Sequence, residues 1–309
     1  MRSLILSRTA HTRVGLEFRT DGLAIALTRS ARYPSLKLME SYWLPSAPNK
    51  RLQNLRNFVR EQGLKGVSCD IVLPRNDYQR IELDAPNVPE TELESAVHWA
   101  VQALMDDAGM DAQVEYFDYP KEALRNRPPR LHARVARQAL IDTLTQSAIA
   151  VGLKPKRITV SDLALKNLSE TIEPSNELQL TLKCENDFGL ITIHKSSQLY
   201  FSRDFAISRR ATLSADEEMA QVAIEVQRSI DFFEGQTGLA LPRQIRLLSS
   251  FSESDRVALE MLLGSAVIRL PLQSKLKAVD AYTDTSGDAL LKTQNAVAVL
   301  CASNSEANA

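Results

Sequence analysis

The sequence predicts an α/β protein built from two halves, each of which opens with antiparallel strands. Near the N-terminus Val14, Leu16 and Phe18 alternate with small or polar residues, and residues 23–27 repeat this two-residue period, which is typical of β-strands. Comparable alternation returns at residues 178–184 and precedes the longest amphipathic helix of the chain. The 309 residues, of which 44% are hydrophobic and 24% charged, fit a globular chain of about two domains.

The first unit is predicted to be a strand meander, a helix and a returning strand. Thr20-Asp21-Gly22 separates the first two strands and is typical of a hairpin turn, in which Gly22 can take a positive φ. Two more strands are predicted at residues 34–44 and 67–74, and a helix at 50–62 lies between them. Antiparallel strands followed by a helix and a returning strand form an α/β unit.

A smaller unit of strands and helices follows. Its strands are predicted at residues 77–83, 113–119 and 131–137, with helices at 89–105 and 138–151 and a surface loop at 124–130. The first helix is expected to bury the apolar residues that recur at helical spacing, Leu93, Val97, Val101 and Leu104. A strand at 158–160 is expected to return to the first unit.

The second half repeats the opening pattern of the first. Strands are predicted at residues 178–184, 188–194 and 198–205, followed by the long helix at 216–234 with Gly235 at its C-terminus. The remaining elements are expected to be a strand at 244–248, a helix at 253–263, a strand at 267–270 and a helix at 288–301. The tail at 303–309 is expected to be disordered.

Composition and motifs exclude several classes of function. A net charge of −1 argues against a general nucleic-acid binder. Cys69, Cys184 and Cys301 lie far apart and form no Cys-x-x-Cys pair, so they are expected to be reduced core residues rather than zinc ligands or disulfides. The chain shows no secretory signal, no apolar run long enough to span a bilayer and no hydrolase or Walker motif, so we expect a cytoplasmic protein.

Several strings resemble the PilM family of type IV pilus assembly proteins. The most specific is Ile224–Phe233 in the long helix. Leu73-Pro74 followed by the acidic helix start Pro89–Glu94, then Phe201–Asp204 and Asn295–Val299, are similar in kind and occur in the same order. Within the family, the chain is most similar to members that serve the biogenesis of mannose-sensitive haemagglutinin (MSHA) pili.

The resemblance implies an actin-like ATPase (FtsA/PilM-like) two-lobed fold with an inserted small α+β subdomain and a reduced second lobe. The implied first lobe comprises residues 1–75, 155–175 and 275–309. The inserted subdomain spans 76–154, and the second lobe spans 176–274. Since a short segment replaces the outer subdomain of the second lobe, the wall that would enclose an adenine is expected to be missing.

In that fold ATP lies between the lobes, held by an acidic residue for Mg²⁺ and by glycine-rich turns. Here Glu17 stands for the acid, Arg19 replaces a glycine and Ala24 a lysine, in the turn completed by Thr20, Asp21 and Gly22. The resemblance further assigns Thr192 and His194 to the second phosphate loop, and Ser249-Ser250 to a third, glycine-rich turn.

These replacements predict a non-catalytic pseudo-ATPase with no metal and no bound ATP or Mg²⁺. Side chains at glycine positions block the approach of phosphate to the backbone, and a missing acid removes the Mg²⁺ anchor. Three alternatives remain open: a plain structural hairpin, an anion attracted by Arg19 and His194, or an active ATPase in which Glu17 holds Mg²⁺ and a partner completes the missing wall.

The function implied is a cytoplasmic scaffold of a type IV (MSHA-type) pilus assembly platform. It would bind the short cytosolic N-terminal tail of a PilN/MshJ-like inner-membrane protein, contact other platform proteins, and lie at the inner membrane through these partners. A groove between the first unit and the inserted subdomain is expected, with Tyr78, Tyr116 and Tyr119 as candidate contacts or, alternatively, ordinary core residues of the small subdomain. A homo-oligomer is possible, and a cytoplasmic module of a type II secretion platform is the alternative assembly.

Overall fold

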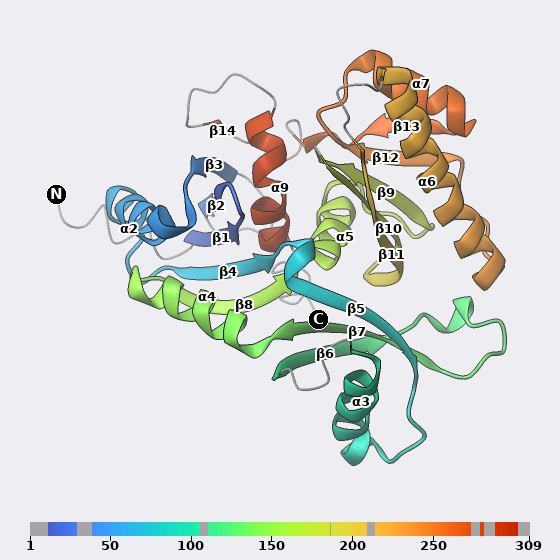
Figure 1. The fold of residues 1–309 in the computed structure, drawn as a ribbon, viewed down its shortest axis with the longest axis horizontal. Helices are drawn as coiled ribbons and strands as arrows, with labels where there is room; N and C mark the ends of the chain where they lie inside the picture. Colours follow the sequence, from blue (N-terminus) through green and yellow to red (C-terminus); the bar gives the residue numbers. More distant parts are fainter. Residues whose placement is uncertain are drawn as a thin grey trace.

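A computed structural model describes residues 12–29, 39–105, 111–185, 187–208, 214–272, 279–280 and 288–301. Its strands form three separate sheets, each covered by helices, and Figure 1 shows them side by side. The predicted tail at 303–309 and the first part of the predicted strand at 34–44 lie outside the described residues. No helix in the described ranges is both long and apolar enough to cross a bilayer.

The first sheet has the strand order β14-β3-β2-β1-β4-β8. Its members are β1 (Thr12–Phe18), β2 (Gly22–Arg29), β3 (Met39–Pro45), β4 (Ser68–Leu73), β8 (Lys154–Val160) and β14 (Val279–Asp280). The helices α2 (Arg51–Glu61) and α4 (Gln138–Ala150) bury apolar side chains on one face of this sheet. On the other face lie α5 (Ser161–Ile172) and α9 (Asp288–Cys301).

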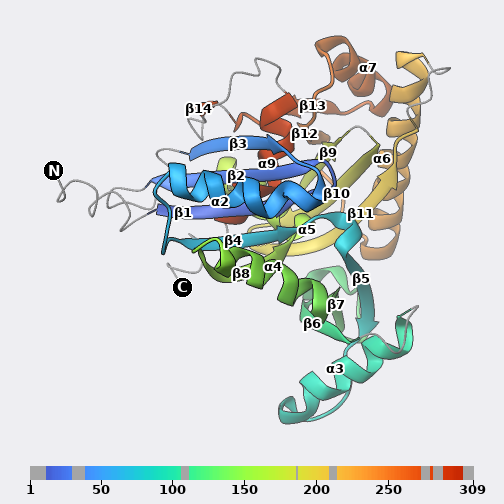
Figure 2. The same cartoon turned by 60° about the vertical axis from the view of Figure 1, so that its left-hand side comes forward.

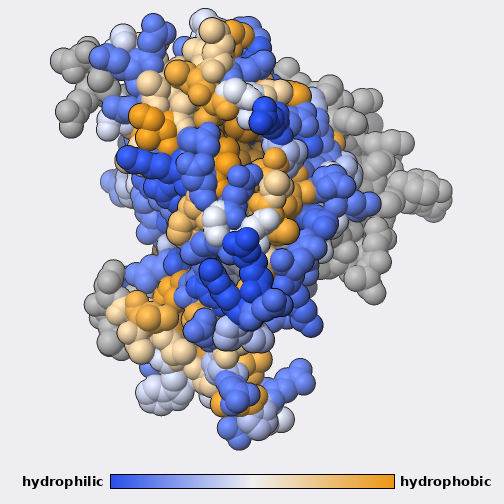
Figure 3. All heavy atoms as spheres, turned by 90° about the vertical axis from the view of Figure 1, so that its right-hand side faces the viewer, coloured by the Kyte–Doolittle hydropathy of each residue, from blue (hydrophilic) through white to orange (hydrophobic). Residues whose placement is uncertain are grey.

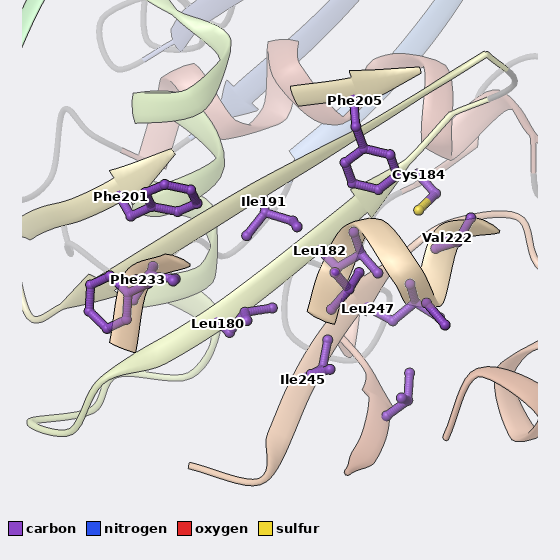
Figure 4. Packing of buried hydrophobic residues seen from close by; sticks show 14 of the residues in the cluster. Leu180, Leu182, Cys184, Ile191, Phe201, Phe205, Val222, Phe233, Ile245 and Leu247 are labelled. Atoms are coloured by element: carbon purple, nitrogen blue, oxygen red, sulfur yellow. The ribbon is translucent and has the colours of Figure 1, made fainter. Parts of the chain in front are cut away.

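The second sheet has the order β11-β10-β9-β12-β13. It is built from β9 (Gln179–Cys184), β10 (Phe188–Lys195), β11 (Gln198–Ala206), β12 (Gln244–Leu248) and β13 (Ala266–Arg269). Figure 4 shows side chains from its strands meeting Val222 and Phe233 of α6 (Ala215–Thr237), and α7 (Glu253–Leu263) completes this layer. Apolar side chains remain exposed on α6, α7 and β13, at Ile224, Phe232, Val257, Met261, Leu262 and Ile268, and Figure 3 shows apolar residues exposed on the face that it views.

The smallest sheet has three strands in the order β5-β7-β6. These are β5 (Tyr78–Asp84), β6 (Ala112–Asp118) and β7 (Arg130–Arg137), packed against α3 (Glu90–Leu104). Val97 and Val101 are fully buried as predicted, but the prediction for Leu104 is wrong because its side chain is 57% exposed. The helix ends there, and Met105 fills the core position instead.

The two large sheets repeat the same local topology. In each, the first strand pairs antiparallel with the second and parallel with the strand that follows the next helix, so β1 corresponds to β9 and β4 to β12. The spacing is also equal, because Glu17 lies opposite Ala24 and Lys183 lies opposite Leu190. By this register Glu17 is equivalent to Lys183, two residues before the equivalent turn positions Arg19 and Glu185.

Two helices fill the space between the large sheets. Side chains of α5 and α9 share one core cluster with Val72 of the first sheet and with Leu190 and Leu248 of the second. Helix α9 approaches β1 so closely that a Cβ on Gly15 would overlap the carbonyl oxygen of Ala296. The halves therefore share a continuous apolar interior, and Figure 2 shows α5 and α9 behind the first sheet.

Local details correct three further expectations. Helix α5 was not predicted, although its buried residues recur at helical spacing. Helix α6 continues past Gly235 and ends at Gly238, whose φ is +68°. Gly22 does not take a positive φ; it is required because a Cβ would lie 2.6 Å from the carbonyl oxygen of Leu44 and 2.7 Å from the ring of Trp43. The three cysteines are buried and free, as predicted.

Candidate functional site

The tips of the two equivalent hairpins meet through an ion pair. Arg19, in the turn after β1, donates from Nη2 to Oε2 of Glu185 over 2.7 Å. Glu185 follows β9, so the contact joins the first sheet to the second. The two side chains are only 18% and 11% exposed, and this burial keeps the pair out of reach of most solvent screening.

A chain of polar contacts continues from this pair into the interior. Nζ of Lys183 lies 2.7 Å from Oε1 of Glu185 and donates to Oδ1 of Asn295 over 2.8 Å. Asn295, on α9, donates from Nδ2 to Oε1 of Glu17 over 2.7 Å. We call this set of five residues, Glu17, Arg19, Lys183, Glu185 and Asn295, the clasp. It connects β1, β9 and α9.

The charges of the clasp largely compensate one another. Burial alone would raise the pKa of Glu185, but Lys183 and Arg19 together lower it to about 2, so this carboxylate stays ionised. Burial raises the pKa of Glu17, and Arg19 and Lys183 offset this only in part. One oxygen of Glu17, Oε2, has no hydrogen-bond partner among the described residues.

The register makes this arrangement a charge inversion between the halves. The acid Glu17 has the base Lys183 as its counterpart, and the base Arg19 has the acid Glu185. A phosphate site needs free backbone N–H groups and an available acid for Mg²⁺. At both turns the equivalent positions carry long charged side chains, and those of one turn neutralise those of the other. The interaction that this arrangement supports is ion pairing between the lobes.

The remaining turn residues are also engaged. The backbone N–H of Arg19 donates to the carbonyl oxygen of Gly22 over 2.9 Å. The backbone N–H of Ser46 donates to the carbonyl oxygen of Asp21 over 3.1 Å. The carbonyl oxygen of Thr20 accepts from Arg51 Nη2 over 2.9 Å. Thr20 and Asp21 are exposed, and their carbonyl oxygens accept these hydrogen bonds from Arg51 and Ser46.

The structure does not bring Thr192 and His194 to this junction. His194 pairs with Gln179 at the far end of β9. This pair lies four residues along the strand from the Leu190–Lys183 pair, a distance of about 13 Å. Both side chains are fully buried and lack hydrogen-bond partners among the described residues. Sequence reasoning placed the second loop one strand too late; the equivalent turn is residues 185–187.

His194 also cannot help Arg19 to attract an anion. Burial, together with the nearby cations Lys166 and Arg246, lowers the pKa of His194 to about 3, so its ring is neutral at physiological pH. The ring lies on the same face of β10 as Leu190, which packs in the cluster between the sheets. The anion site expected from Arg19 and His194 is therefore not supported.

Ser249 and Ser250 lie after β12, in a turn whose carbonyl oxygens are contacted by Arg269. The guanidinium of Arg269 donates to the carbonyl oxygens of Ser249, over 3.4 Å, Phe251 and Ser252. The backbone N–H of Phe251 donates to Oγ of Ser249 over 3.3 Å. Since this turn directs its carbonyl oxygens to a cation, it does not offer a cradle for phosphate.

A cavity of about 490 Å³ adjoins the clasp. Residues 17–20, 74–77 and the β9–β10 turn form its polar part, while α2 and α4 contribute Leu52, Leu140, Leu144 and other residues. Burial raises the pKa of Asp77 in this wall, with Arg51 opposing the shift. Among the described residues, no group of three His, Cys, Asp or Glu side chains could hold a metal ion. A polar end beside apolar walls suits a short extended peptide.

The three candidate tyrosines do not form one exposed edge. Tyr78 is buried and donates to Oδ1 of Asp162 over 3.1 Å. Tyr119 is buried in the core of the second lobe and stacks on His132, with ring centroids 4.8 Å apart. Tyr116 is partly buried in the core of the small sheet. Tyr116 thus fits the alternative that the sequence left open, a core residue of the small subdomain, whereas Tyr78 and Tyr119 are buried in the cores of the first and second sheets.

A second polar cluster, missed by sequence reasoning, joins all three sheets. Asp162, at the start of α5, accepts from Arg134 Nη2 over 2.7 Å, from Ser202 over 2.7 Å and from Tyr78. These partners come from β7, β11 and β5 respectively. Burial alone would raise the pKa of Asp162, but Arg134 and Ser202 lower it. The small sheet is therefore fixed to both lobes.

Comparisons with solved structures show the same architecture. The chain is similar to a PilM-PilN type IV pilus biogenesis complex, with a TM-score of 0.69 and 17% identity over 94% of this chain and 98% of the other. It is also similar to the cytoplasmic domain of EpsL, an inner membrane component of the type II secretion system of Vibrio cholerae, with a TM-score of 0.52 and 14% identity over 94% of both chains.

A protein of unknown function with an actin-like ATPase fold from Bacteroides thetaiotaomicron matches with a TM-score of 0.51 and 11% identity, over 94% of this chain and 99% of that one. No family model matches the sequence, and no curated protein does. At these identities the likeness concerns the fold, and the predicted two-lobed actin-like α/β fold is confirmed.

Proposed function

We propose that this protein is a non-catalytic, actin-like scaffold of a type IV pilus assembly platform. It binds the cytosolic N-terminal tail of a PilN-like inner-membrane protein and lies at the cytoplasmic face of that membrane through this contact. The observation that carries the proposal is the clasp, which places compensating side chains where the fold would hold a nucleotide.

The clasp supports the absence of ATP hydrolysis. A phosphate at this junction would displace Glu185 from Arg19 and Lys183, and would place its own negative charge beside Glu17. Two partners already hold the pKa of Glu185 at about 2, so the ion pairs are strongly favoured at neutral pH. Glu17 is only 1% exposed and bonded to Asn295, which leaves it a poor ligand for hydrated Mg²⁺.

The partner is proposed from the structural likeness and from the cavity. One similar structure is described as a PilM-PilN complex. In this chain the cavity beside α4 offers apolar walls and a charged end, which suit an extended segment with apolar side chains. Leu144 and Ala148 of α4 are buried in the core of the first sheet, so this wall of the site would be preformed.

The finer assignment rests on the sequence strings in the long helix and elsewhere. They favour the MSHA pilus system, in which the chain would take the role of MshI and its partner that of MshJ. A type II secretion module is the second candidate assembly, favoured by the likeness to the EpsL cytoplasmic domain. An ATPase of the same fold is the alternative activity, and it requires the clasp to open.

Peptide binding tests the proposed partner. A fluorescent peptide copying the cytosolic N-terminal segment of a PilN/MshJ-like protein is titrated with the full chain. Thr143 is exposed on α4 and lines the cavity, so Thr143→Arg should fill it and weaken binding at least about tenfold. Gln146 is exposed on the same helix but does not line the cavity, so Gln146→Arg is the matched control. Equal binding by both variants would contradict this site.

A further inference from the structure

A second surface of the protein gathers unpaired basic side chains. Arg56 and Arg60 lie on the outer face of α2, Lys65 lies in the turn that follows, and Lys154 and Lys156 lie at the start of β8. All five are exposed. We call this set the basic face.

The topology brings these segments to one end of the molecule. Strands β1, β4 and β8 run parallel, so their first residues lie at the same edge of the sheet, beside the C-termini of α2 and α4. The N–H of Gly66 donates to the carbonyl oxygen of Gly152 over 2.7 Å, and that of Lys154 to Val67 over 2.9 Å. Figures 1 and 2 show α2 and the starts of β4 and β8 together, away from α6.

The side chains of the basic face lack acidic partners. Among the described residues, no carboxylate lies within ion-pair distance of any of the five. Arg56 donates to Gln53 over 3.1 Å and Arg60 to Asn57 over 3.2 Å, which keeps both guanidinium groups on the outer face without neutralising them. By contrast, Arg13 at the same end pairs with Asp70 over 2.5 Å.

Local structural roles explain only part of this pattern. A cation near a helix C-terminus complements the helix dipole, which accounts for Arg60, and lysine on an edge strand discourages pairing with other strands, which accounts for Lys154 and Lys156. Neither role requires all five charges at one end of a molecule with a net charge of −1. Residues 51–67 and 149–157 contain a single acidic residue, Glu61.

We propose that the basic face binds the anionic headgroups of a phospholipid bilayer. Long exposed side chains suit a flat, fluid array of charges, and each basic residue near such a membrane adds to the attraction. Ile149, 49% exposed in the last turn of α4, can add an apolar contact. Attraction of this kind is weak alone, so a tail-binding partner would supply the second signal for stable attachment.

The proposal also sets an orientation. The cavity adjoins Glu17 and Pro74, at the C-terminal ends of β1 and β4, whereas the basic face lies at the start of these strands. A chain resting on the basic face would therefore turn its cavity away from the bilayer. This inference does not depend on the identity of the peptide partner or on nucleotide binding.

Vesicle co-sedimentation of the full chain tests the proposal without any partner. The probes are phosphatidylcholine vesicles with and without phosphatidylglycerol, at low and high salt. We expect binding only to vesicles that contain phosphatidylglycerol, and loss of this binding at high salt. The variant Arg60→Gln/Lys65→Gln/Lys154→Gln/Lys156→Gln should bind at least about tenfold more weakly, because four surface charges are removed.

The matched control removes the same charge elsewhere. Lys121, Arg127, Arg137 and Arg243 are exposed and lack an ion pair among the described residues. Their combined change to Gln should leave vesicle binding within about twofold of the wild type, provided that position rather than net charge matters. No binding to anionic vesicles, or equal losses in both variants, would overturn the proposal. Tight binding of polyglutamate without vesicle binding would also overturn it and indicate an acidic protein instead.

Discussion

Arg19 and Glu185 occupy equivalent positions in the two halves of the fold and pair with each other over 2.7 Å. Arg19 follows β1 and Glu185 follows β9 at the same position in the strand pairing, yet the two side chains carry opposite charges. The same holds for Glu17 and Lys183, which precede them by two residues. The protein's own side chains thus bridge the junction between the lobes, and all five residues of the clasp line the cavity of about 490 Å³.

Removing the buried cation of the clasp should strongly destabilise the fold. Lys183→Met leaves Glu185 with one partner fewer and removes a hydrogen bond from Asn295. Lys183 is 2% exposed, so we expect a loss of about 3–5 kcal/mol in the free energy of unfolding, measured by urea denaturation. Lys195→Met breaks the exposed pair with Glu122 and should cost about 1 kcal/mol or less. Equal small losses would show that the clasp carries little stability.

The contact between the lobes should appear as an energetic coupling. In a double-mutant cycle, Arg19→Met and Glu185→Gln are measured singly and together. Because the pair is largely buried, the coupling energy should be about 1 kcal/mol or more. The exposed helix pair Arg228–Glu225 offers the reference cycle, expected at about 0.3–0.5 kcal/mol. Additive effects of Arg19 and Glu185 would mean that the pair does not hold the lobes together.

Two buried histidines should make stability depend on pH. Burial lowers the pKa of His132 and His194 from 6.5 to about 3, so between these values the unfolded chain binds protons that the folded chain does not. The free energy of unfolding should therefore fall as pH drops below 6.5, by up to about 1.4 kcal/mol per unit for each histidine.

The two histidines can be separated by substitution. His194→Gln and His132→Gln should each reduce the slope of stability against pH between about pH 6.5 and 5, and the double variant should lose both contributions and keep the opposite dependence expected from the raised pKa of Glu17. Urea denaturation across this window measures the slope. An unchanged slope in His194→Gln would mean that this ring is protonated in the folded protein.

Two glycines should respond in opposite ways to alanine. Gly15→Ala would place a Cβ on top of the carbonyl oxygen of Ala296, so α9 would have to move away from β1. We expect a loss of several kcal/mol, of order 3. Gly235 lies inside α6 with no atom within 4 Å of the place that a Cβ would take, and Gly235→Ala should raise stability by about 0.5–1 kcal/mol. Thermal and urea unfolding of both variants check this contrast.

Most of the fold could be predicted from the sequence because hydrophobic residues recur with a strong period in most elements. The hairpin of β1 and β2 and the long helix α6 were predicted close to their observed bounds. Helix α5 was not predicted, although Ala164, Leu165 and Leu168 are buried and recur at helical spacing. Leu104 was misplaced although the end of the helix was predicted correctly, because Met105, just past that end, takes the core position.

Only part of the site could be predicted from the sequence. Glu17 and Arg19 stand in a recognisable turn, but their partners lie far away in sequence: 166 positions separate Arg19 from Glu185, and 278 separate Glu17 from Asn295. No local pattern encodes such pairs. One signal was available, since residues 185–187 separate the alternating runs 178–184 and 188–194 as residues 20–22 separate the first two strands.

Nucleotide binding is the most direct test of the central claim. Isothermal titration calorimetry of the full chain with Mg²⁺-ATP, paired with the melting temperature in the same mixtures, measures it. We predict no saturable heat and no rise in melting temperature, because the clasp already satisfies the charges at the junction. Saturable binding with a Kd in the range of about 1–10 μM would contradict the account and would make Glu17 and Arg19 nucleotide ligands.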